Sequence, residues 1–168
     1  MTIFKCPDFS NSEEFLHKIR NPYYLYISIP LLMFALIYLS MKEKVAEPLV
    51  PLALLTLIKA ILMAASIAAG AFGMINFQQR MKKIDYQVEL RVKLCNYYIL
   101  FMARNLWLGL ATLTAVLGLY LTKAQEFTLI FVVFLILFSI GSPTYYRISN
   151  SLQLNQDEKD IIYKKKPI

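Results

Sequence analysis

Two ionisable side chains interrupt the apolar stretches of this 168-residue chain, and they are its first candidates for chemistry. Counted from Pro48 at ~1.5 Å per residue, Lys59 would lie ~16 Å along a helix, near the middle of a bilayer. An ionisable group at that depth costs several kcal/mol and marks a functional site by default. Lys59 shares a helical stripe with Ser66, and together they could line a polar cavity. The alternative is that the flexible Lys59 side chain extends to the outer surface.

The second charge is Arg104, which Asn105 follows directly. Counted back from Thr122, Arg104 lies ~27 Å along its helix, at the cytoplasmic boundary. A guanidinium at that depth either anchors the helix to lipid phosphates or binds an anion or headgroup through its planar fork. The predicted intramembrane polar site therefore comprises Lys59, Ser66, Arg104 and Asn105.

The remaining motifs argue against catalysis. The apolar cores contain no Asp or Glu, and the single histidine, His17, lies outside them. The chain has no Ser/His/Asp set, no Walker motif and no GxGxxG. Cys6 and Cys95 belong to no CxxC motif and fall on the predicted cytoplasmic side, where thiols stay reduced, so neither a disulfide nor a metal site is expected. We therefore predict no catalytic residue, cofactor or metal, and favour a protein that is not an enzyme.

Long apolar stretches must position these residues. About 20 apolar residues span the ~30 Å hydrocarbon core as a helix, and such segments must be helical because the core offers no water to backbone groups. The sequence predicts one all-α membrane domain over residues 1–168, a four-helix transmembrane bundle. Its mean hydropathy of +0.50 fits this class. The predicted spans are 22–41, 49–73, 98–121 and 125–142.

The segments outside the spans are predicted to be helical as well. Residues 1–21 are expected to form an interfacial helix that Ser10 and Glu13 cap and Asn21-Pro22 ends. Helices 2 and 3 should continue into the cytoplasm as a hairpin that reverses near residues 84–87, with Asp85 as a cap. Residues 143–168 form an amphipathic basic tail whose first helix starts with Ser142 as N-cap.

Small residues predict where the helices approach one another most closely. Ala65, Ala69 and Gly73 recur every four residues, the spacing that lets two backbones touch in lipid. The partner of this face is either another helix of the chain or a second chain. The fourth span is apolar on every side, so much of it should face lipid.

The distribution of positive charge predicts the orientation. Cytoplasmic segments carry an excess of Lys and Arg. The two short connections hold only Lys42, Lys44 and Lys123, so both termini and the central hairpin are predicted to be cytoplasmic. Basic residues at helix ends also favour anionic lipid headgroups as partners and exclude nucleic acid. The basic residues of the N-terminus, hairpin and tail are Lys5, Lys18, Arg20, Arg80, Lys82, Lys83, Arg91, Lys93, Arg147, Lys159, Lys164, Lys165 and Lys166.

These observations predict a multi-pass protein of the bacterial cytoplasmic (inner) membrane. The leading hypothesis is an accessory or scaffolding subunit of a larger membrane protein complex, because Lys59 lacks an acidic partner within the spans and no catalytic set exists. The alternative is a small oligomeric channel or transporter that passes an anion or lipid-like substrate. The expected partners are membrane lipids and either another membrane protein or a second copy.

Overall fold

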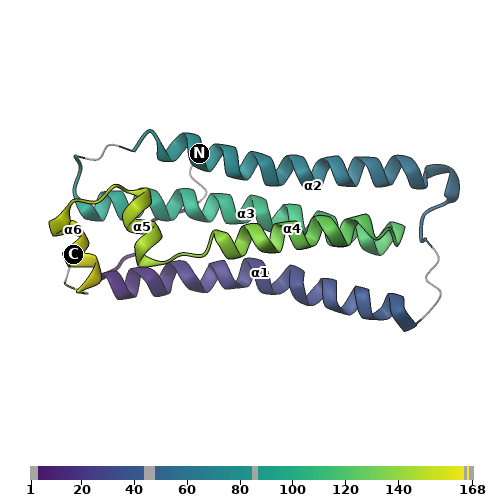
Figure 1. Cartoon of the computed structure of the whole chain (residues 1–168), viewed down its shortest axis with the longest axis horizontal. Helices are drawn as coiled ribbons and strands as arrows, with labels where there is room; N and C mark the ends of the chain where they lie inside the picture. Colours follow the sequence, from purple (N-terminus) through teal and green to yellow (C-terminus); the bar gives the residue numbers. More distant parts are fainter. Residues whose placement is uncertain (1–3, 44–47, 85–86, 165, 167–168) are drawn as a thin grey trace. The chain divides into compact units, whose positions relative to one another are not determined.

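The computed structural model describes residues 4–43, 48–84, 87–164 and 166, and within them the regular structure is entirely helical. Its elements are α1 (Ser12–Glu43), α2 (Leu52–Met81), α3 (Leu90–Thr122), α4 (Glu126–Ile140), α5 (Tyr145–Ser151) and α6 (Gln156–Tyr163) (Figure 1). Three of them, α1, α2 and α3, are long and apolar enough to cross a membrane. This confirms an all-α chain and indicates a membrane protein.

The chain divides into two compact units. Unit 1 contains Met1–Tyr24, Met74–Asn105 and Ser142–Ile168, and unit 2 contains Leu25–Gly73 and Leu106–Gly141. Each unit is described by itself. The N-terminus, the α2–α3 hairpin and the C-terminal segment, distant in sequence, thus belong to one unit.

The centre of unit 2 is a stripe of four phenylalanines along α4. Phe127, Phe131, Phe134 and Phe138 are all buried, and they lie on one face because they are spaced by four, three and four residues. Glycines make room for two of the rings. A Cβ on Gly118 would lie 2.3 Å from Phe127 Cε1, and one on Gly70 would lie 2.4 Å from Phe134 Cε1. Glycine therefore lets α3 and α2 approach α4 closely.

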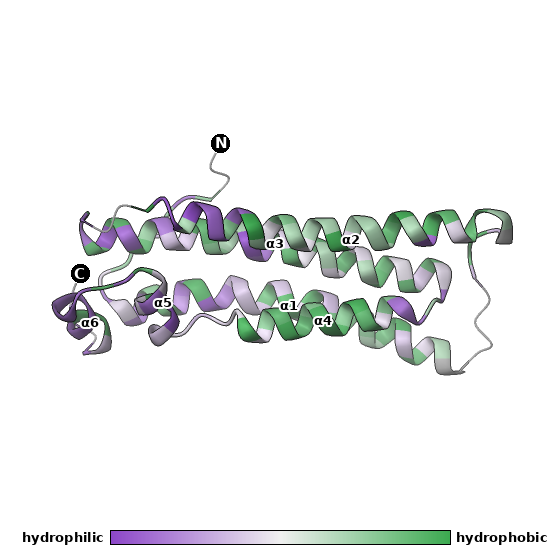
Figure 2. Cartoon of the chain, turned by 45° about the horizontal axis from the view of Figure 1, so that its top comes forward, coloured by the Kyte–Doolittle hydropathy of each residue, from purple (hydrophilic) through white to green (hydrophobic). Residues whose placement is uncertain are grey.

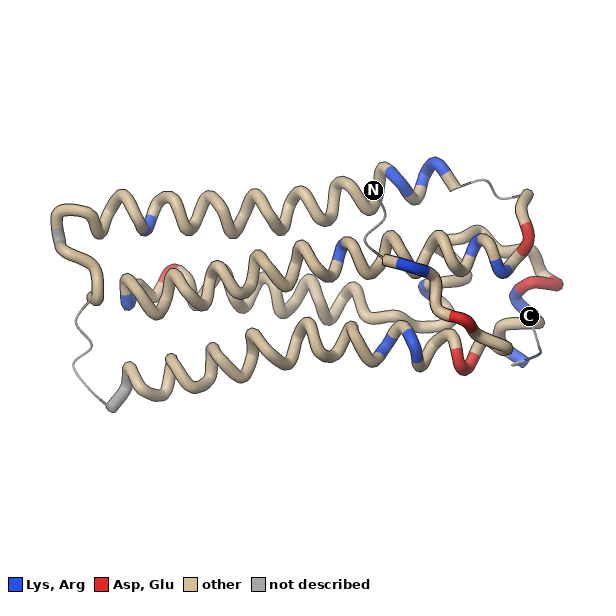
Figure 3. Tube along the Cα trace, turned by 180° about the vertical axis from the view of Figure 1, so that it is seen from behind, with Lys and Arg blue, Asp and Glu red and all other residues tan. Residues whose placement is uncertain are grey.

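The outward faces of unit 2 are apolar. Figure 2 shows hydrophobic colour along these helices, and Figure 3 shows long stretches of the trace that carry no charged residue. Exposed large apolar side chains on this scale are abnormal in water and normal against lipid. They include Leu32, Leu36 and Leu39 of α1, Leu57, Ile61 and Ile67 of α2, and Leu129, Val133 and Ile140 of α4. As expected, much of α4 is exposed on the surface of unit 2, but its phenylalanine side is packed.

Unit 1 has a hydrophobic core of its own. Phe15, Leu16 and Ile19 of α1 are no more than 4% exposed there. This corrects the prediction that residues 1–21 form a separate interfacial helix, because their apolar face packs against protein. The helix also continues through Asn21-Pro22 into the first long apolar segment. Further buried members of this core are Phe9, Leu94, Tyr97, Phe101, Ile148, Leu152 and Ile162.

The N-caps of α1 and α5 differ from the predicted residues by one and two positions. Asn11, not Ser10, caps α1: its Oδ1 accepts a hydrogen bond from the Glu14 N–H at 2.8 Å, and Glu14 accepts from the Ser10 N–H. At the start of α5, Thr144 rather than Ser142 is the N-cap. As predicted, α2 continues past Gly73, to Met81. The helix α3 begins at Leu90, later than an N-cap at Asp85 implies. Asp85 lies outside the described residues.

Candidate functional site

Lys59 forms an ion pair within the chain. Its Nζ lies 2.5 Å from Glu126 Oε1, at the first residue of α4, and the two side chains are 31% and 50% exposed. This corrects the premise that Lys59 lacks an acidic partner within the predicted spans, since Glu126 lies inside the predicted segment 125–142. Lys59 is also closer to its helix start than predicted, because α2 begins at Leu52 rather than at Pro48.

Beside this ion pair, unit 2 has an open depression of about 640 Å³. Its lining combines a phenol, an amide, a carboxylate and a hydroxyl with one leucine. The depression is thus more polar than the mostly apolar pockets that usually bind small molecules. The lining residues are Tyr38 of α1, Gln125 before α4, and Glu126, Thr128 and Leu129 of α4.

Ser66 is a packing residue in unit 2. It is fully buried, and its hydroxyl donates a hydrogen bond to the Ala111 carbonyl of α3 at 2.8 Å. With Gly70 it forms the side of α2 that contacts α3 and α4. Of the predicted packing face, Gly73 is buried, Ala69 is half-buried and Ala65 is exposed. Whether that face binds another helix stays a prediction.

Arg104 and Asn105 lie in unit 1, whereas Lys59 and Ser66 belong to unit 2. The Arg104 guanidinium carbon lies 4.6 Å from the centroid of the Phe101 ring and 4.9 Å from that of Phe77. Rings on which a cation stacks stabilise the charge after its removal from water. Arg104 also donates to Asn105 Oδ1 at 3.3 Å. The aromatic pair thus explains how a charged residue that is only 8% exposed is tolerated here.

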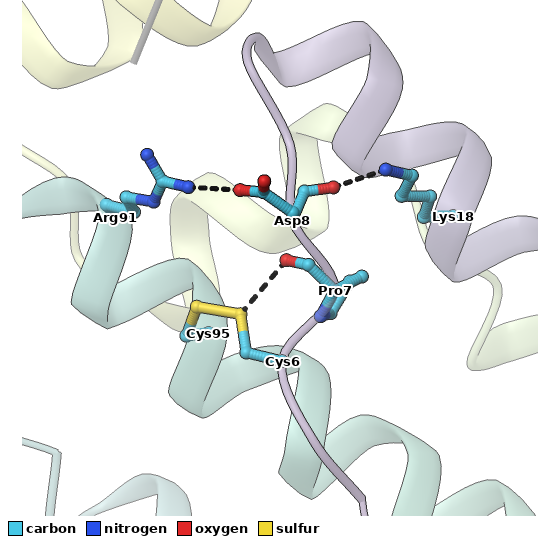
Figure 4. The surroundings of a disulfide bond; sticks show 6 residues. All are labelled: Cys6, Pro7, Asp8, Lys18, Arg91 and Cys95. Carbon is cyan, nitrogen blue, oxygen red and sulfur yellow. Dashed lines mark hydrogen bonds and ion pairs between the residues drawn. A yellow bond between two sulfur atoms is a disulfide. The ribbon is translucent and has the colours of Figure 1, made fainter.

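Cys6 and Cys95 form a disulfide in unit 1 (Figure 4). Their Cα atoms are 5.2 Å apart, and 89 positions separate them in the sequence. This corrects the prediction of two reduced thiols. The bond fastens the segment before α1 to α3, and both cysteines are half-buried.

Charged contacts hold the same segment beside the disulfide. Arg91 Nη2 of α3 lies 2.5 Å from Asp8 Oδ1, and Lys18 Nζ of α1 donates to the Asp8 carbonyl. Figure 4 shows Asp8 between these two basic side chains. The neighbouring Phe9 is 2% exposed, and its ring contacts Phe15 edge to face at a centroid distance of 5.0 Å.

A second ion pair in unit 1 is buried. Lys93 Nζ lies 2.6 Å from Glu158 Oε1, with side-chain exposures of 3% and 17%. It joins α3 to α6, and nearby the Ser12 hydroxyl donates to the Ile162 carbonyl at 2.9 Å. Sequence reasoning missed this pair because nothing local indicates that residue 93 meets residue 158.

The described residues contain no group of three or more His, Cys, Asp or Glu side chains that could hold a metal ion. The comparisons with known proteins add no family: the chain matches no family model, no curated protein and no solved structure. The candidate features are thus the Lys59–Glu126 pair with its depression and the Cys6–Cys95 disulfide with its contacts.

Proposed function

We propose that this protein is a non-catalytic accessory or scaffolding subunit of a larger membrane protein complex. The observation that carries the proposal is an exposed small-residue stripe on α2. Ala60, Ala64 and Ala68 are all exposed and recur every four residues. Small residues at this spacing allow a partner helix to approach within backbone contact in lipid.

This stripe, here called the alanine stripe, lies opposite the packed side of α2. At 100° per residue, Ala64 is ~160° around the helix from Ser66, which binds α3. The internal contacts of unit 2 therefore leave the alanine stripe uncovered. An intramembrane surface that invites close packing, on a chain without a catalytic set, supports a role in binding another membrane protein.

We further propose four membrane crossings with unit 1 in the cytoplasm. The chain passes through unit 2 four times, and α4 has 15 residues, or ~22 Å. The fourth pass is therefore shorter than the ~30 Å hydrocarbon core, a mismatch that a bilayer accommodates by local thinning. The basic residues of the three unit 1 segments support the cytoplasmic side.

The test is copurification from native membranes in nanodiscs, followed by mass spectrometry. We expect a stoichiometric partner that is lost in Ala64→Leu and Ala68→Leu, because leucine at a close helix contact forces the backbones apart. Ala35→Leu is the matched control, an exposed alanine on α1 that should retain the partner. Loss of the partner in all three variants, or in none, would refute the assignment to the alanine stripe.

One observation favours a second candidate, a small oligomeric channel or transporter for an anion or lipid-like substrate. The depression beside Glu126 is lined by polar groups, and the Lys59 ammonium lies at its edge through the ion pair. Lys59→Met should then abolish anion or lipid flux in proteoliposomes without dissociating a complex. Unchanged flux in that variant, compared with the native chain, would count against transport.

A further inference from the structure

We infer that the Cys6–Cys95 disulfide is a redox-sensitive latch that holds the N-terminal strap, residues 4–11, against α1 and α3. The inference rests on the proposed cytoplasmic location of unit 1. Disulfides in that compartment are usually transient and redox-sensing, because thiol systems reduce them. In that location we expect the Cys6–Cys95 bond to open and re-form.

The contacts around the bond are suited to release. Besides the disulfide and the cap of α1, two polar contacts hold the strap: the Asp8–Arg91 ion pair and the hydrogen bond from Lys18 to the Asp8 carbonyl. The Arg91 and Asp8 side chains are 49% and 92% exposed. Exposed ion pairs contribute little to stability. Phe9 is the one large side chain of the strap that is deeply buried, against Phe15 and below Arg91 (5.4 Å from guanidinium carbon to ring centroid). The disulfide is the covalent link between the strap and α3.

The chemistry is thiol–disulfide exchange with a cellular dithiol. One thiolate attacks either sulfur, the Cys6–Cys95 bond breaks, and a mixed disulfide forms. The second thiol of the reductant then displaces the cysteine, so the dithiol leaves oxidised and two electrons and two protons reside on the Cys6 and Cys95 thiols. A disulfide of the same class reverses the reaction. Neither cysteine is fully buried, so we expect a small dithiol to reach the bond.

Release of the strap changes the surface of unit 1. Phe9 covers Phe15, which is 2% exposed and also contacts the Tyr98 ring at a centroid distance of 6.5 Å. Without Phe9, an apolar spot formed by Phe15 and Tyr98 opens beside the basic side chains Lys18 and Arg91. The oxidised chain hides this spot and the reduced chain presents it.

The experiment uses the full chain in nanodiscs equilibrated with dithiothreitol buffers of increasing reducing power. Free thiols are trapped by maleimide, and hydrogen exchange is measured at residues 8–11. We expect the disulfide to convert reversibly to two thiols. Amide hydrogen exchange at residues 8–11 should be on the order of tenfold faster in the reduced chain than in the oxidised chain. Cys6→Ser and Cys95→Ser should show that fast exchange in every buffer. Asp8→Asn, which loses only the ion pair, should keep slow exchange while oxidised.

Two results would overturn the latch: unchanged exchange at residues 8–11 in both cysteine variants, or a bond that stays intact in the folded chain under excess dithiothreitol. The orientation is tested separately, with Lys83→Cys in a Cys6→Ser/Cys95→Ser chain. Labelling of that cysteine from outside intact cells would show that unit 1 is external. The cytoplasmic orientation would then fail, and the disulfide would be a permanent bond of an oxidising compartment rather than a latch, even if it opens in vitro.

Discussion

The glycine at position 118 permits a sharp test of how unit 2 is packed. In a Gly118→Ala variant, the new Cβ would lie 2.3, 2.5 and 2.6 Å from Cε1, Cζ and Cδ1 of Phe127. Carbon atoms pack at ~3.5–4.0 Å, so each contact is short by about 1 Å or more. The Phe127 ring is fully buried with Ala115 and Leu119 around it, so it has little room to move. The start of α4 must shift instead.

The expected cost follows from two opposing effects. Forcing a methyl group into a packed core typically costs ~1–3 kcal/mol. Replacing glycine by alanine inside a helix offsets ~1 kcal/mol of that cost through helix propensity. Gly109→Ala is the matched control, because Gly109 is also within α3 and its Cβ would lie 3.4 Å from Tyr26 Cδ1, close to an ordinary contact. The propensity gain cancels between the variants, so Gly118→Ala should be ~1–3 kcal/mol less stable than Gly109→Ala.

The assay is the free energy of unfolding in mild detergent, titrated with a denaturing detergent and followed by circular dichroism. A second comparison places Gly118→Ala in a Phe127→Leu chain. The smaller side chain should remove most of the clash, so alanine should cost less there than in the native chain. Equal stability of Gly118→Ala and Gly109→Ala would refute the proposed contact between α3 and the phenylalanine stripe.

Two further predictions concern polar contacts, and both are measured as free energies of unfolding in the same assay. Lys93→Met should cost ~3–5 kcal/mol because it leaves the Glu158 carboxylate buried without its cation. Lys59→Met should cost less, because the Lys59 and Glu126 side chains are 31% and 50% exposed. Similar costs for the two lysine variants would contradict this reasoning. Ser66→Ala should cost ~0.6 kcal/mol, the usual worth of a hydrogen bond between membrane helices, and a cost near zero would mean that the Ala111 carbonyl finds another donor.

The sequence predicted the long helices well because their cause is local. An apolar segment of some 20 residues must be helical in lipid whatever surrounds it. The same holds for the continuation of α2 to Met81, since neither Gly nor Pro occurs between Gly73 and Gly109. Cap positions were less certain because Ser10, Asn11 and Ser12 can all cap a helix, and the choice among them depends on how residues 12–24 pack in unit 1.

The packed side of α4 could not be predicted from its own pattern. Nearly every position from Phe127 to Ile140 is apolar, hence no period distinguishes a buried face from a lipid face. The distinction comes from Gly70 and Gly118, which lie on other helices and accept the rings of Phe134 and Phe127. Glycines in the predicted spans indicate that helices approach closely there. Which side chains pack against those glycines is known only from the structure.

The candidate site features were missed for a related reason: their partners are remote in the sequence. Cys6 and Cys95 are the only two cysteines, so one pairing was possible, yet the predicted compartment argued against it. The compartment was inferred from charge and the bond from proximity, and these are independent properties. A cytoplasmic location of unit 1 and a disulfide within it are compatible if the bond opens and closes. If the bond instead stays oxidised in cells, the orientation predicted from the basic residues is wrong. The orientation of the whole chain would then have to be reversed.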